Sequence, residues 1–589
     1  MTSLDLKSPV IKEVKYNEYA FRELERQVKG DEKARELLLE YPTDYIIYSS
    51  DKDKDGNYDV YVGETNDIGR RTMQHLNDDS KERDDWEYLS KQSDASMFVI
   101  GHEHFNKSLT LDIENRMMLY LTSVDHVKKL NNRRFNNQNK YYTSEEMADL
   151  FSKIWRSLRK RKKDLFPIEQ VIKDSAIFKA SPFHSLTNEQ HKARELILDK
   201  VKNSIRSNQT GQLIFVEGDA GSGKTVLLSS LFYTINTELV DGLGHRPRNY
   251  LLVNHDQQLT VYQQIAKKLD LDQYDRDVVS KPTHFINTHD EDDPVDVVLI
   301  DEAHLLWTQG KQSYQGKNQL SDILARAKVT IVIFDKHQSL TTEEYWKDDV
   351  IDKIRKDADN KHNLIKLNNQ MRMDASPRTI SWIRSLVYDK NVKPIPIDDR
   401  NYDLKIFDSP IELEKAIRKH DSDKENQKDG LSRLLATFDW EYKNNKNPDD
   451  GEYWEVKVDN WERPWNLQIK GDRNQRRKNK GLSWAEQTQT INEIGSTYTI
   501  QGFDLNYSGV IIGPSVKYRK GKIIFDPHES HNHKAIQNRT VDGKTKVNNA
   551  DRFLQNELNV LLTRGVHGLY IYAVDDELRQ ALLDAQKNY

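Results

Sequence analysis

An apolar run, a glycine-rich turn and a second apolar segment follow one another between residues 212 and 232. The run is Gln212–Glu217, the turn is Gly218–Thr225 with the sequence GDAGSGKT, and the second segment begins at Val226. This order predicts a strand, a loop and a helix whose N-terminus faces the loop. Glycines let backbone N–H groups converge on one point, which the helix dipole makes attractive to anions. We therefore expect a polyphosphate site here.

The turn also carries two side chains suited to a nucleoside triphosphate. Lys224 is placed to reach the β- and γ-phosphates, and Thr225 can offer its hydroxyl to Mg²⁺. An accidental glycine turn would not be expected to have both flanks correct. We therefore predict that ATP and Mg²⁺ bind here. The backbone around the phosphates would come from Gly218, Gly221, Ser222 and Gly223.

Composition narrows the class of protein. The 589 residues predict several domains, and no apolar stretch reaches the roughly 20 residues that a membrane-spanning helix needs. The N-terminus lacks the apolar core of a signal peptide. The absence of cysteine excludes disulfides, thiolate metal sites and a cysteine nucleophile. We expect a multidomain cytoplasmic protein that does not act on membranes.

Basic residues are clustered rather than spread over the chain. The formal net charge is −5, yet Arg156–Lys163 and Lys470–Lys480 are both rich in lysine and arginine. Such clusters can follow a phosphate backbone even in an acidic protein. Each cluster alone is equally consistent with a solvated helix face or a loop. Both are candidate contacts for nucleic acid.

The hydrophobic pattern divides the chain into parts. Short strands at 45–48 and 59–63 open a small α/β unit, while continuous apolar runs such as Val329–Phe334 indicate strands buried on both faces of a parallel sheet. We predict an N-terminal helical segment at 1–43, the α/β unit at 44–142, a basic helix with a linker at 143–183, and two parallel α/β domains at 184–345 and 346–589, the last with insertions at about 400–480 and 514–550.

Two adjacent carboxylates follow the apolar run Val297–Ile300. Asp301 at the strand tip would hold Mg²⁺, and Glu302 would orient and deprotonate an attacking water molecule. The alternative is an ordinary acidic strand end. The phosphate loop that precedes this pair in the chain favours the catalytic interpretation.

Further polar motifs follow in order along the chain. Gln338, three residues after Asp335, could sense a γ-phosphate, and Gln190, upstream of the phosphate loop, could read the edge of adenine. Arg372 and Arg564 could reach the phosphates from a facing domain, although either arginine could instead form a surface salt bridge. A last element, Gln501–Asp504, precedes the strand that begins near residue 509, and its Gly502 is a further candidate for binding the nucleotide.

This ordered series resembles superfamily 1 helicases over roughly residues 184–589, and within that superfamily the Schlafen-type helicase-like proteins of bacteria. The finer resemblance rests on the residues of Phe334–Gln338 and Asn368–Arg372. The resemblance to these helicases implies two RecA-like domains with ATP between them. The predicted insertions depart from the pattern and leave the path of the nucleic acid open.

A second set of motifs precedes residue 143. Tyr48 ends the triplet Ile-Ile-Tyr, and Tyr61 begins the triplet Tyr-Val-Gly. Arg71 and His75 are four residues apart, so they project from one face of a helix. Glu114 lies just ahead of an apolar helical run.

These residues resemble a GIY-YIG nuclease domain over about 44–142, although the first triplet lacks its glycine. The resemblance implies phosphodiester hydrolysis with one divalent metal, Mg²⁺ or Mn²⁺, held by Glu114, with Arg71 stabilising the transition state. Tyr48, Tyr61 and His75 would position or deprotonate water. Because tyrosine has a pKa near 10, activation by the metal or by His75 is expected. The alternatives are tyrosines that only pack a small core, or a decayed nuclease that only binds.

Together these motifs predict an α/β nuclease–helicase that uses ATP and acts on nucleic acid, with DNA favoured over RNA. The fusion suggests an enzyme that attacks foreign nucleic acid, as in defence against phage. Three other functions stay open: a repair or recombination helicase–nuclease, a non-cutting ATP-gated binding switch, and an ATPase acting on protein. The sequence does not determine oligomeric state or direction of movement.

Overall fold

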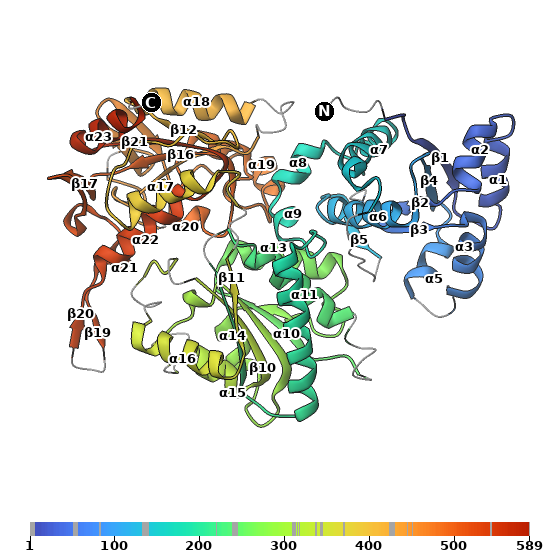
Figure 1. Cartoon of the computed structure of the whole chain (residues 1–589), viewed down its shortest axis with the longest axis horizontal. Coiled ribbons are helices and arrows are strands. Elements are labelled where there is room, and N and C mark those ends of the chain that lie inside the picture. The colour runs from blue at the N-terminus through green and yellow to red at the C-terminus, as the bar shows by residue number, and fades with distance from the viewer. Residues whose placement is uncertain are drawn as a thin grey trace. The chain divides into compact units, whose positions relative to one another are not determined.

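The chain forms two compact units. The first comprises residues 1–187 with the segments 229–246 and 262–278, and the second comprises 188–228, 247–261 and 279–589. Figure 1 shows the chain coloured from its N-terminus to its C-terminus. The computed structural model describes residues 6–50, 57–79, 81, 84–131, 141–218, 221–237, 239, 245–308, 314, 316, 318–335, 338–341, 346–368, 372–422, 430–444, 446–449, 451–541 and 545–587.

The first unit is built on a five-stranded sheet in the order β1-β4-β2-β3-β5. All neighbours in this sheet are antiparallel except β3 and β5. The predicted N-terminal helical segment instead begins with a strand of this sheet, and α1 and α2 follow it. The sequence VIKEVK buries Ile11 and Val14, which are three residues apart and so lie on opposite faces of the strand. The strands are β1 (Val10–Lys15), β2 (Thr43–Ser50), β3 (Tyr58–Thr65), β4 (Ser96–Gly101) and β5 (Val127–Leu130), and the helices are α1 (Ala20–Gln27) and α2 (Glu32–Leu39).

Helices cover this sheet. An apolar core that includes Tyr45, Tyr61 and Trp86 packs between the sheet and the helices α1, α2, α3 and α5. The helix α6 contacts β2 and β3. The basic helix α7 is tied to the N-terminal strand, because Arg161 Nη2 donates to the Ile11 carbonyl at 2.9 Å. The bounds are α3 (Ile68–Gln74), continued by a π-helical turn (His75–Asp79), α5 (Asp84–Lys91), α6 (Lys107–Thr122) and α7 (Met147–Arg161).

The second unit contains a six-stranded sheet in the order β11-β6-β10-β9-β7-β8, and every neighbouring pair is parallel. Strand β11 follows the predicted domain boundary at 345 but pairs with β6, so this sheet continues to Leu367. The strands are β6 (Gln212–Gly218), β7 (Asn249–Val253), β8 (Val279–Ser280), β9 (Val295–Asp301), β10 (Ala327–Phe334) and β11 (Leu364–Leu367). The helices used below are α10 (Asn188–Ser207), α11 (Lys224–Thr237), α13 (Asp256–Lys268) and α16 (Asp348–Asn360).

A second parallel sheet follows in the same unit, with strand order β12-β21-β16-β13. The mixed α/β class with two parallel sheets is thus confirmed. Part of the predicted insertion 400–480 is wrong, because β12, α18 and β13 belong to this sheet and its helical cover. The strands are β12 (Asp403–Ile406), β13 (Arg433–Ala436), β16 (Leu505–Ile512) and β21 (Gly565–Ala573), with helices α17 (Pro377–Val387), α18 (Pro410–Ser422), α22 (Ala550–Leu562) and α23 (Asp576–Lys587).

A smaller subdomain lies between β13 and β16. It holds a hairpin of β14 (Glu455–Val458) and β15 (Trp461–Pro464), followed by the short helix α19 (Arg473–Lys478). Trp461 and Trp465 are buried in a core shared with the second parallel sheet. The predicted insertion at 514–550 contains two further hairpins, β17 (Val516–Arg519) with β18 (Lys522–Phe525), and β19 (Arg539–Val541) with β20 (Thr545–Val547).

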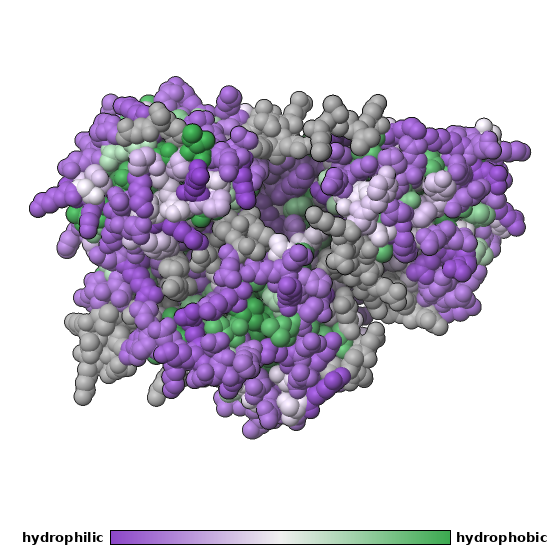
Figure 2. Space-filling model, viewed as in Figure 1, coloured by the Kyte–Doolittle hydropathy of each residue, from purple (hydrophilic) through white to green (hydrophobic). Residues whose placement is uncertain are grey.

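The surface is polar. Figure 2 shows hydrophilic residues over most of the visible face of each unit, with apolar residues in small areas. Across the residues that the structure describes, no helix combines the length and the apolar character needed to cross a membrane.

Candidate functional site

The phosphate loop connects β6 to α11, as predicted. Gly221 and Gly223 have φ angles of +84° and +74°, in the left-handed region that favours glycine. A Cβ atom at Gly218 would lie 2.5 Å from Ser222 Oγ and 2.8 Å from the Leu367 carbonyl oxygen. Three of the loop's glycines are therefore required by the backbone or by the space available. Asp219 and Ala220 lie outside the described residues.

Lys224 begins a buried network that runs from the first parallel sheet to the second. Its Nζ donates to the Gly218 carbonyl at 2.6 Å and to Asp335 Oδ2 at 3.2 Å. The same Asp335 oxygen accepts a hydrogen bond from Gln338 Nε2 at 2.7 Å. Gln338 Oε1 in turn accepts one from Arg564 Nη2 at 3.4 Å. The structure thus brings Lys224, Gln338 and Arg564 together.

Arg564 is fully buried at the end of α22. Its guanidinium also donates to the carbonyls of Val560 at 3.0 Å and Phe503 at 3.3 Å. Burial lowers the pKa of Arg564 to about 9, and the positive charge of Arg372 acts in the same direction. Arg372 itself forms an ion pair with Asp504, with 2.6 Å between Nε and Oδ1. Both predicted arginines therefore lie in one place, and Arg564 still carries its charge at neutral pH.

The acidic pair stands at the end of β9. Asp301 is buried, and its Oδ2 accepts a hydrogen bond from Gln258 Nε2 at 2.8 Å. Glu302 has a φ of +48°, a strained conformation of a kind that persists where the surrounding structure holds it, often at functional sites. Glu302 Oε2 is buried without a hydrogen-bond partner and lies 3.4 Å from Nε2 of the buried His304. A carboxylate oxygen in this state is what a bound water molecule would satisfy.

These features fit Mg²⁺-bound ATP. The Ser222 hydroxyl in the loop and Glu302 Oε2 are buried polar atoms without hydrogen-bond partners. Thr225 occupies the first turn of α11, one residue after Lys224. Asp301 and Thr225 would hold the cation, and the loop backbone with Lys224 would hold the phosphates.

Two predicted residues are placed differently from what the sequence suggests. Gln190 is buried on α10, and its Nε2 donates to the carbonyls of Ser222 at 3.4 Å and Gly223 at 3.2 Å. It holds the loop here, and its contact with adenine stays a prediction. Gly502 has a φ of +84°, and a Cβ atom there would lie 3.3 Å from Gln258 Oε1. This glycine brings the second parallel domain against the start of α13.

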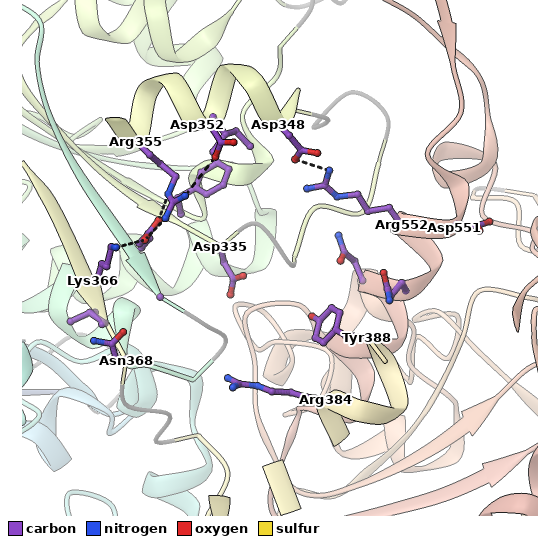
Figure 3. A pocket seen from close by; sticks show the side chains of 17 residues that line it. Asp335, Asp348, Asp352, Arg355, Lys366, Asn368, Arg384, Tyr388, Asp551 and Arg552 are labelled. Atoms are coloured by element: carbon purple, nitrogen blue, oxygen red, sulfur yellow. Dashed lines mark hydrogen bonds and ion pairs between the residues drawn. The ribbon is translucent and has the colours of Figure 1, made fainter. Parts of the chain in front are cut away.

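A cavity of about 1000 Å³ opens beside the phosphate loop, large enough for a nucleotide. One side of the cavity is formed at the ends of β6, β10 and β11 by Gly218, Asp335 and Asn368. Arg384 on α17 lines the other side. Figure 3 shows the Arg384 side chain reaching from α17 into this cavity. The motifs missed Arg384 because no recognisable pattern surrounds it in the sequence. In the same wall Arg355 binds Glu217 through two hydrogen bonds, at 2.6 and 2.8 Å.

A second polar cluster lies in the first unit. Tyr45 Oη and His75 Nε2 are 2.8 Å apart, and His75 Nδ1 lies 2.6 Å from Asp79 Oδ2. The ring of Tyr61 stacks on Tyr45 at 6.0 Å, and the ring of Trp86 stacks on His75 at 3.6 Å. Arg71, His75 and Asp79 are each four residues apart, so α3 and its π-helical continuation present them on one side.

Tyr48 does not belong to this cluster, and its predicted place there is wrong. Successive side chains of a strand point to opposite faces, and Tyr48 is three residues from Tyr45. The Tyr48 hydroxyl donates to Glu13, and its ring packs against Phe98 at 5.2 Å. Tyr45 instead takes the position beside His75 that the motif predicts for Tyr48.

The register of β2 and β3 explains why Tyr45 is the right residue. Tyr45 lies opposite Gly63, and Ile47 lies opposite Tyr61. A Cβ atom at Gly63 would lie 2.5 Å from the Tyr45 ring and hydroxyl. The glycine of the second triplet therefore makes room for this tyrosine, which is the signal that could have identified it.

Arg71 and Glu114 both lie near Tyr45. Burial raises the pKa of Tyr45 well above its ordinary value, Tyr61 and Glu114 act in the same direction, and Arg71 opposes them. Arg71 Nη1 is also 3.9 Å from Asp79 Oδ2. The predicted residues Tyr61, Arg71, His75 and Glu114 are thus brought into one neighbourhood, although Tyr61, His75 and Glu114 are buried.

Two carboxylates could hold a cation in this unit. Asp44 is buried next to Tyr45 in the chain, and neither of its carboxylate oxygens has a hydrogen-bond partner. Burial raises the pKa of Asp44, and the negative charge of Glu114 adds to that effect. Within the described ranges, no group of three or more histidine or carboxylate side chains is arranged to hold a metal. The donors fit a cation held by one or two carboxylates and otherwise by water.

Comparison with known proteins finds a family match that lies mostly in the second unit. A family model described as the Schlafen group 3 DNA/RNA helicase domain matches residues 211–575. This range holds the phosphate loop, Asp301, Glu302 and Arg564, and it leaves out the Tyr45 cluster. The uncharacterized protein YPL245W of Saccharomyces cerevisiae is 31% identical over 471 residues, covering 74% of this chain and 98% of that protein. The chain therefore belongs to the Schlafen group 3 family, whose members share a DNA/RNA helicase domain.

Proposed function

We propose that the protein is an ATP-dependent nuclease–helicase, in which the second unit hydrolyses ATP while it binds nucleic acid and the first unit cleaves phosphodiester bonds. One observation carries the motor part of this proposal. Lys224, Asp335, Gln338 and Arg564 form a continuous buried network between the two parallel domains. A network of this kind can report the state of a bound γ-phosphate to both domains.

The ATP site would work through a change of partners. Lys224 would leave Asp335 and the Gly218 carbonyl for the β- and γ-phosphates, since charge-assisted bonds to phosphate are strong. Glu302 would accept a proton from the attacking water through its unpartnered Oε2. Arg564 and Arg372 would stabilise charge on the transferring phosphoryl group. Gln338, which is bonded to Arg564, would change its position when Arg564 moves toward the phosphate. Asp301 and Thr225 would hold Mg²⁺, which would neutralise part of the phosphate charge.

In the first unit, the hydrogen bonds suggest a proton relay. As Tyr45 Oη takes a proton from water, it would pass its own proton to His75 Nε2, and Asp79 would hold the opposite nitrogen of the ring. This relay avoids the problem that a buried tyrosinate is a costly species. Arg71 would stabilise the charged phosphorane, and a divalent metal on Glu114, Mg²⁺ or Mn²⁺, would polarise the phosphate.

One observation favours a non-cutting alternative. Tyr45, Tyr61 and His75 are all buried, and Trp86 stacks on the imidazole. If this packing persists when nucleic acid binds, the first unit would only recognise it, and the protein would be an ATP-gated binding switch.

Two variants separate these functions. Glu114→Ala should abolish cleavage of labelled DNA or RNA while ATP hydrolysis continues, and Lys224→Ala should abolish ATP hydrolysis. Assays with single- and double-stranded DNA and RNA would also decide the substrate, for which we favour DNA. The switch is the correct function if the wild-type protein hydrolyses ATP yet cuts no substrate with Mg²⁺ or Mn²⁺.

The biological role follows from the substrate. Cleavage of foreign nucleic acid, as in defence against phage, and trimming of repair or recombination intermediates both need this pair of activities. The family relationship favours neither role, because the yeast relative is itself uncharacterized. ATP hydrolysis that does not respond to any nucleic acid would instead indicate a protein substrate.

A further inference from the structure

The subdomain between β13 and β16 presents an unneutralised basic surface. We define the α19 basic surface as Lys470, Arg473, Arg476, Lys478 and Lys480, all of which are exposed. Within the described part of the chain, none of these five side chains forms an ion pair with a carboxylate. Two other basic side chains of the subdomain do form ion pairs, Arg463 with Glu414 at 2.9 Å and Lys457 with Glu455 at 3.2 Å. Five positive side chains held close together favour the binding of an anion.

This surface is held in a defined shape. Asp472 caps α19 by accepting a hydrogen bond from the Gln475 backbone at 2.8 Å. On the other side of the helix, Gln475 Nε2 and Asn479 Nδ2 donate to Gln489 Oε1 at 3.2 and 3.0 Å. The polar amide side anchors the helix, so the basic side faces solvent. Binding an anion here would therefore need little reordering of the backbone.

The same subdomain contacts α13, the helix that carries the hydrogen-bond partner of Asp301, the proposed Mg²⁺ ligand. The Trp484 backbone N–H donates to Gln257 Oε1 at 3.3 Å. The next residue of α13, Gln258, donates to Asp301 Oδ2 at 2.8 Å. Trp484 is fully buried, and its indole N–H donates to Glu493 at 2.7 Å. A shift of the subdomain would therefore move the N-terminal turn of α13 and the group that positions Asp301.

We propose that the α19 basic surface binds the sugar–phosphate backbone of nucleic acid, and that Trp484 and Gln257 transmit this binding to Asp301. The proposal rests on the nucleic-acid-dependent ATPase described above and names its contact surface. Arginine suits this task because its planar guanidinium can hold phosphate with two hydrogen bonds. Contacts to phosphate carry no base specificity, so the surface would serve any sequence.

The first experiment measures the binding surface. The variant Arg473→Ala/Arg476→Ala should raise the Kd for a fluorescent single-stranded oligonucleotide about tenfold in anisotropy titrations at moderate salt. The slope of the logarithm of the association constant against the logarithm of salt concentration should become shallower by about 1.4. Each phosphate contact on a single strand contributes about 0.7, and the variant removes two. The control variant Lys415→Ala/Lys419→Ala removes the same charge from the exposed face of α18, and both its Kd and its salt slope should match the wild type. ATP hydrolysis without nucleic acid should be unchanged in both variants.

The second experiment measures the relay. Gln257→Ala should bind the oligonucleotide with wild-type Kd but lose most of its stimulation of ATP hydrolysis. The control is Gln263→Ala, which changes an exposed glutamine further along α13. Stimulation in the control should equal that of the wild type.

The outcomes separate this inference from the function on which it rests. A wild-type protein that binds no nucleic acid would overturn the proposed function. Wild-type binding that survives unchanged in Arg473→Ala/Arg476→Ala, in both Kd and salt slope, would overturn the α19 surface alone. Full stimulation in Gln257→Ala would overturn the relay.

Discussion

A single position in β2 decides where the chemistry of the first unit lies. Tyr45 and Tyr48 are both buried tyrosines on one strand, yet only Tyr45 contacts His75. Sequence alone favoured Tyr48, because it ends an Ile-Ile-Tyr triplet. Strand geometry reverses that assignment, since the two rings lie on opposite faces of the sheet.

This reversal gives a prediction for two matched variants. Tyr45→Phe removes the hydroxyl that bonds to His75, so the rate of phosphodiester cleavage should fall at least about a hundredfold. Tyr48→Phe loses a hydroxyl bonded to Glu13 and should cleave at close to the wild-type rate. Initial rates on one labelled substrate with Mg²⁺ would measure both. Equal losses in the two variants would contradict the placement of the site around Tyr45.

At the scale of elements, α22 links several parts of the second parallel domain. Glu557 on this helix accepts hydrogen bonds from the Phe438 backbone and from Asn532 Nδ2, the latter at 3.0 Å. Burial raises the pKa of Glu557 to about 8, and the negative charge of Asp439 adds to that effect. Between the ordinary pKa of 4.5 and this raised value, the Glu557 carboxyl on α22 is therefore protonated in the folded chain and ionised in the unfolded one.

This proton makes stability depend on pH. The pKa of Glu557 is near 4.5 in the unfolded chain and about 8 in the folded one, so its contribution is complete below the first value and lost as pH rises through the second. The unfolding free energy should fall by at most about 1.4 kcal/mol per pH unit across this window. Denaturant unfolding at several pH values between these limits would measure the slope.

Glu557→Gln is the control for this slope. The amide keeps a carbonyl acceptor but does not titrate, so the variant should lose most of the dependence while nearby groups such as Asp439 keep theirs. A slope that is identical in the variant and the wild type would show that other groups are responsible.

The elements also show what patterns can and cannot reveal. The buried runs that became β6, β9 and β10 were predicted because continuous apolar sequences are typical of central parallel strands. Strands β12 and β13 lie inside the predicted insertion 400–480, so the patterns do not reveal them. Each has only four residues and stands among polar segments, so its hydrophobic signal is too short to separate from a loop.

On the scale of the whole molecule, the first unit is discontinuous in sequence. Residues 229–246 and 262–278 belong to it although they follow the phosphate loop in the chain. Two contacts illustrate this: Phe183 packs against Tyr233 at 5.1 Å, and Lys268 Nζ donates to the carbonyls of Thr122 and Val124 at 3.0 and 2.7 Å.

We expect these segments to stabilise the first unit. In the full chain, Phe183→Ala removes the buried ring that packs against Tyr233, so the unfolding transition of the first unit should move to a lower temperature. Differential scanning calorimetry of the variant and the wild type would test this. Equal midpoints would show that the contact with residues 229–246 does not stabilise the first unit.

The sequence by itself determined the phosphate loop, the acidic strand end at Asp301 and the α/β class, because these depend on neighbouring residues and on local hydrophobic periodicity. Only the tertiary structure decided which distant groups meet. Lys224, Asp335 and Arg564 converge because parallel strands place their carboxyl ends at one edge, and a second domain packs against that edge. Tyr45 meets His75 because the sheet packs the face of β2 that carries residue 45 against α3 and its π-helical continuation, and that packing joins residues 30 positions apart in the chain.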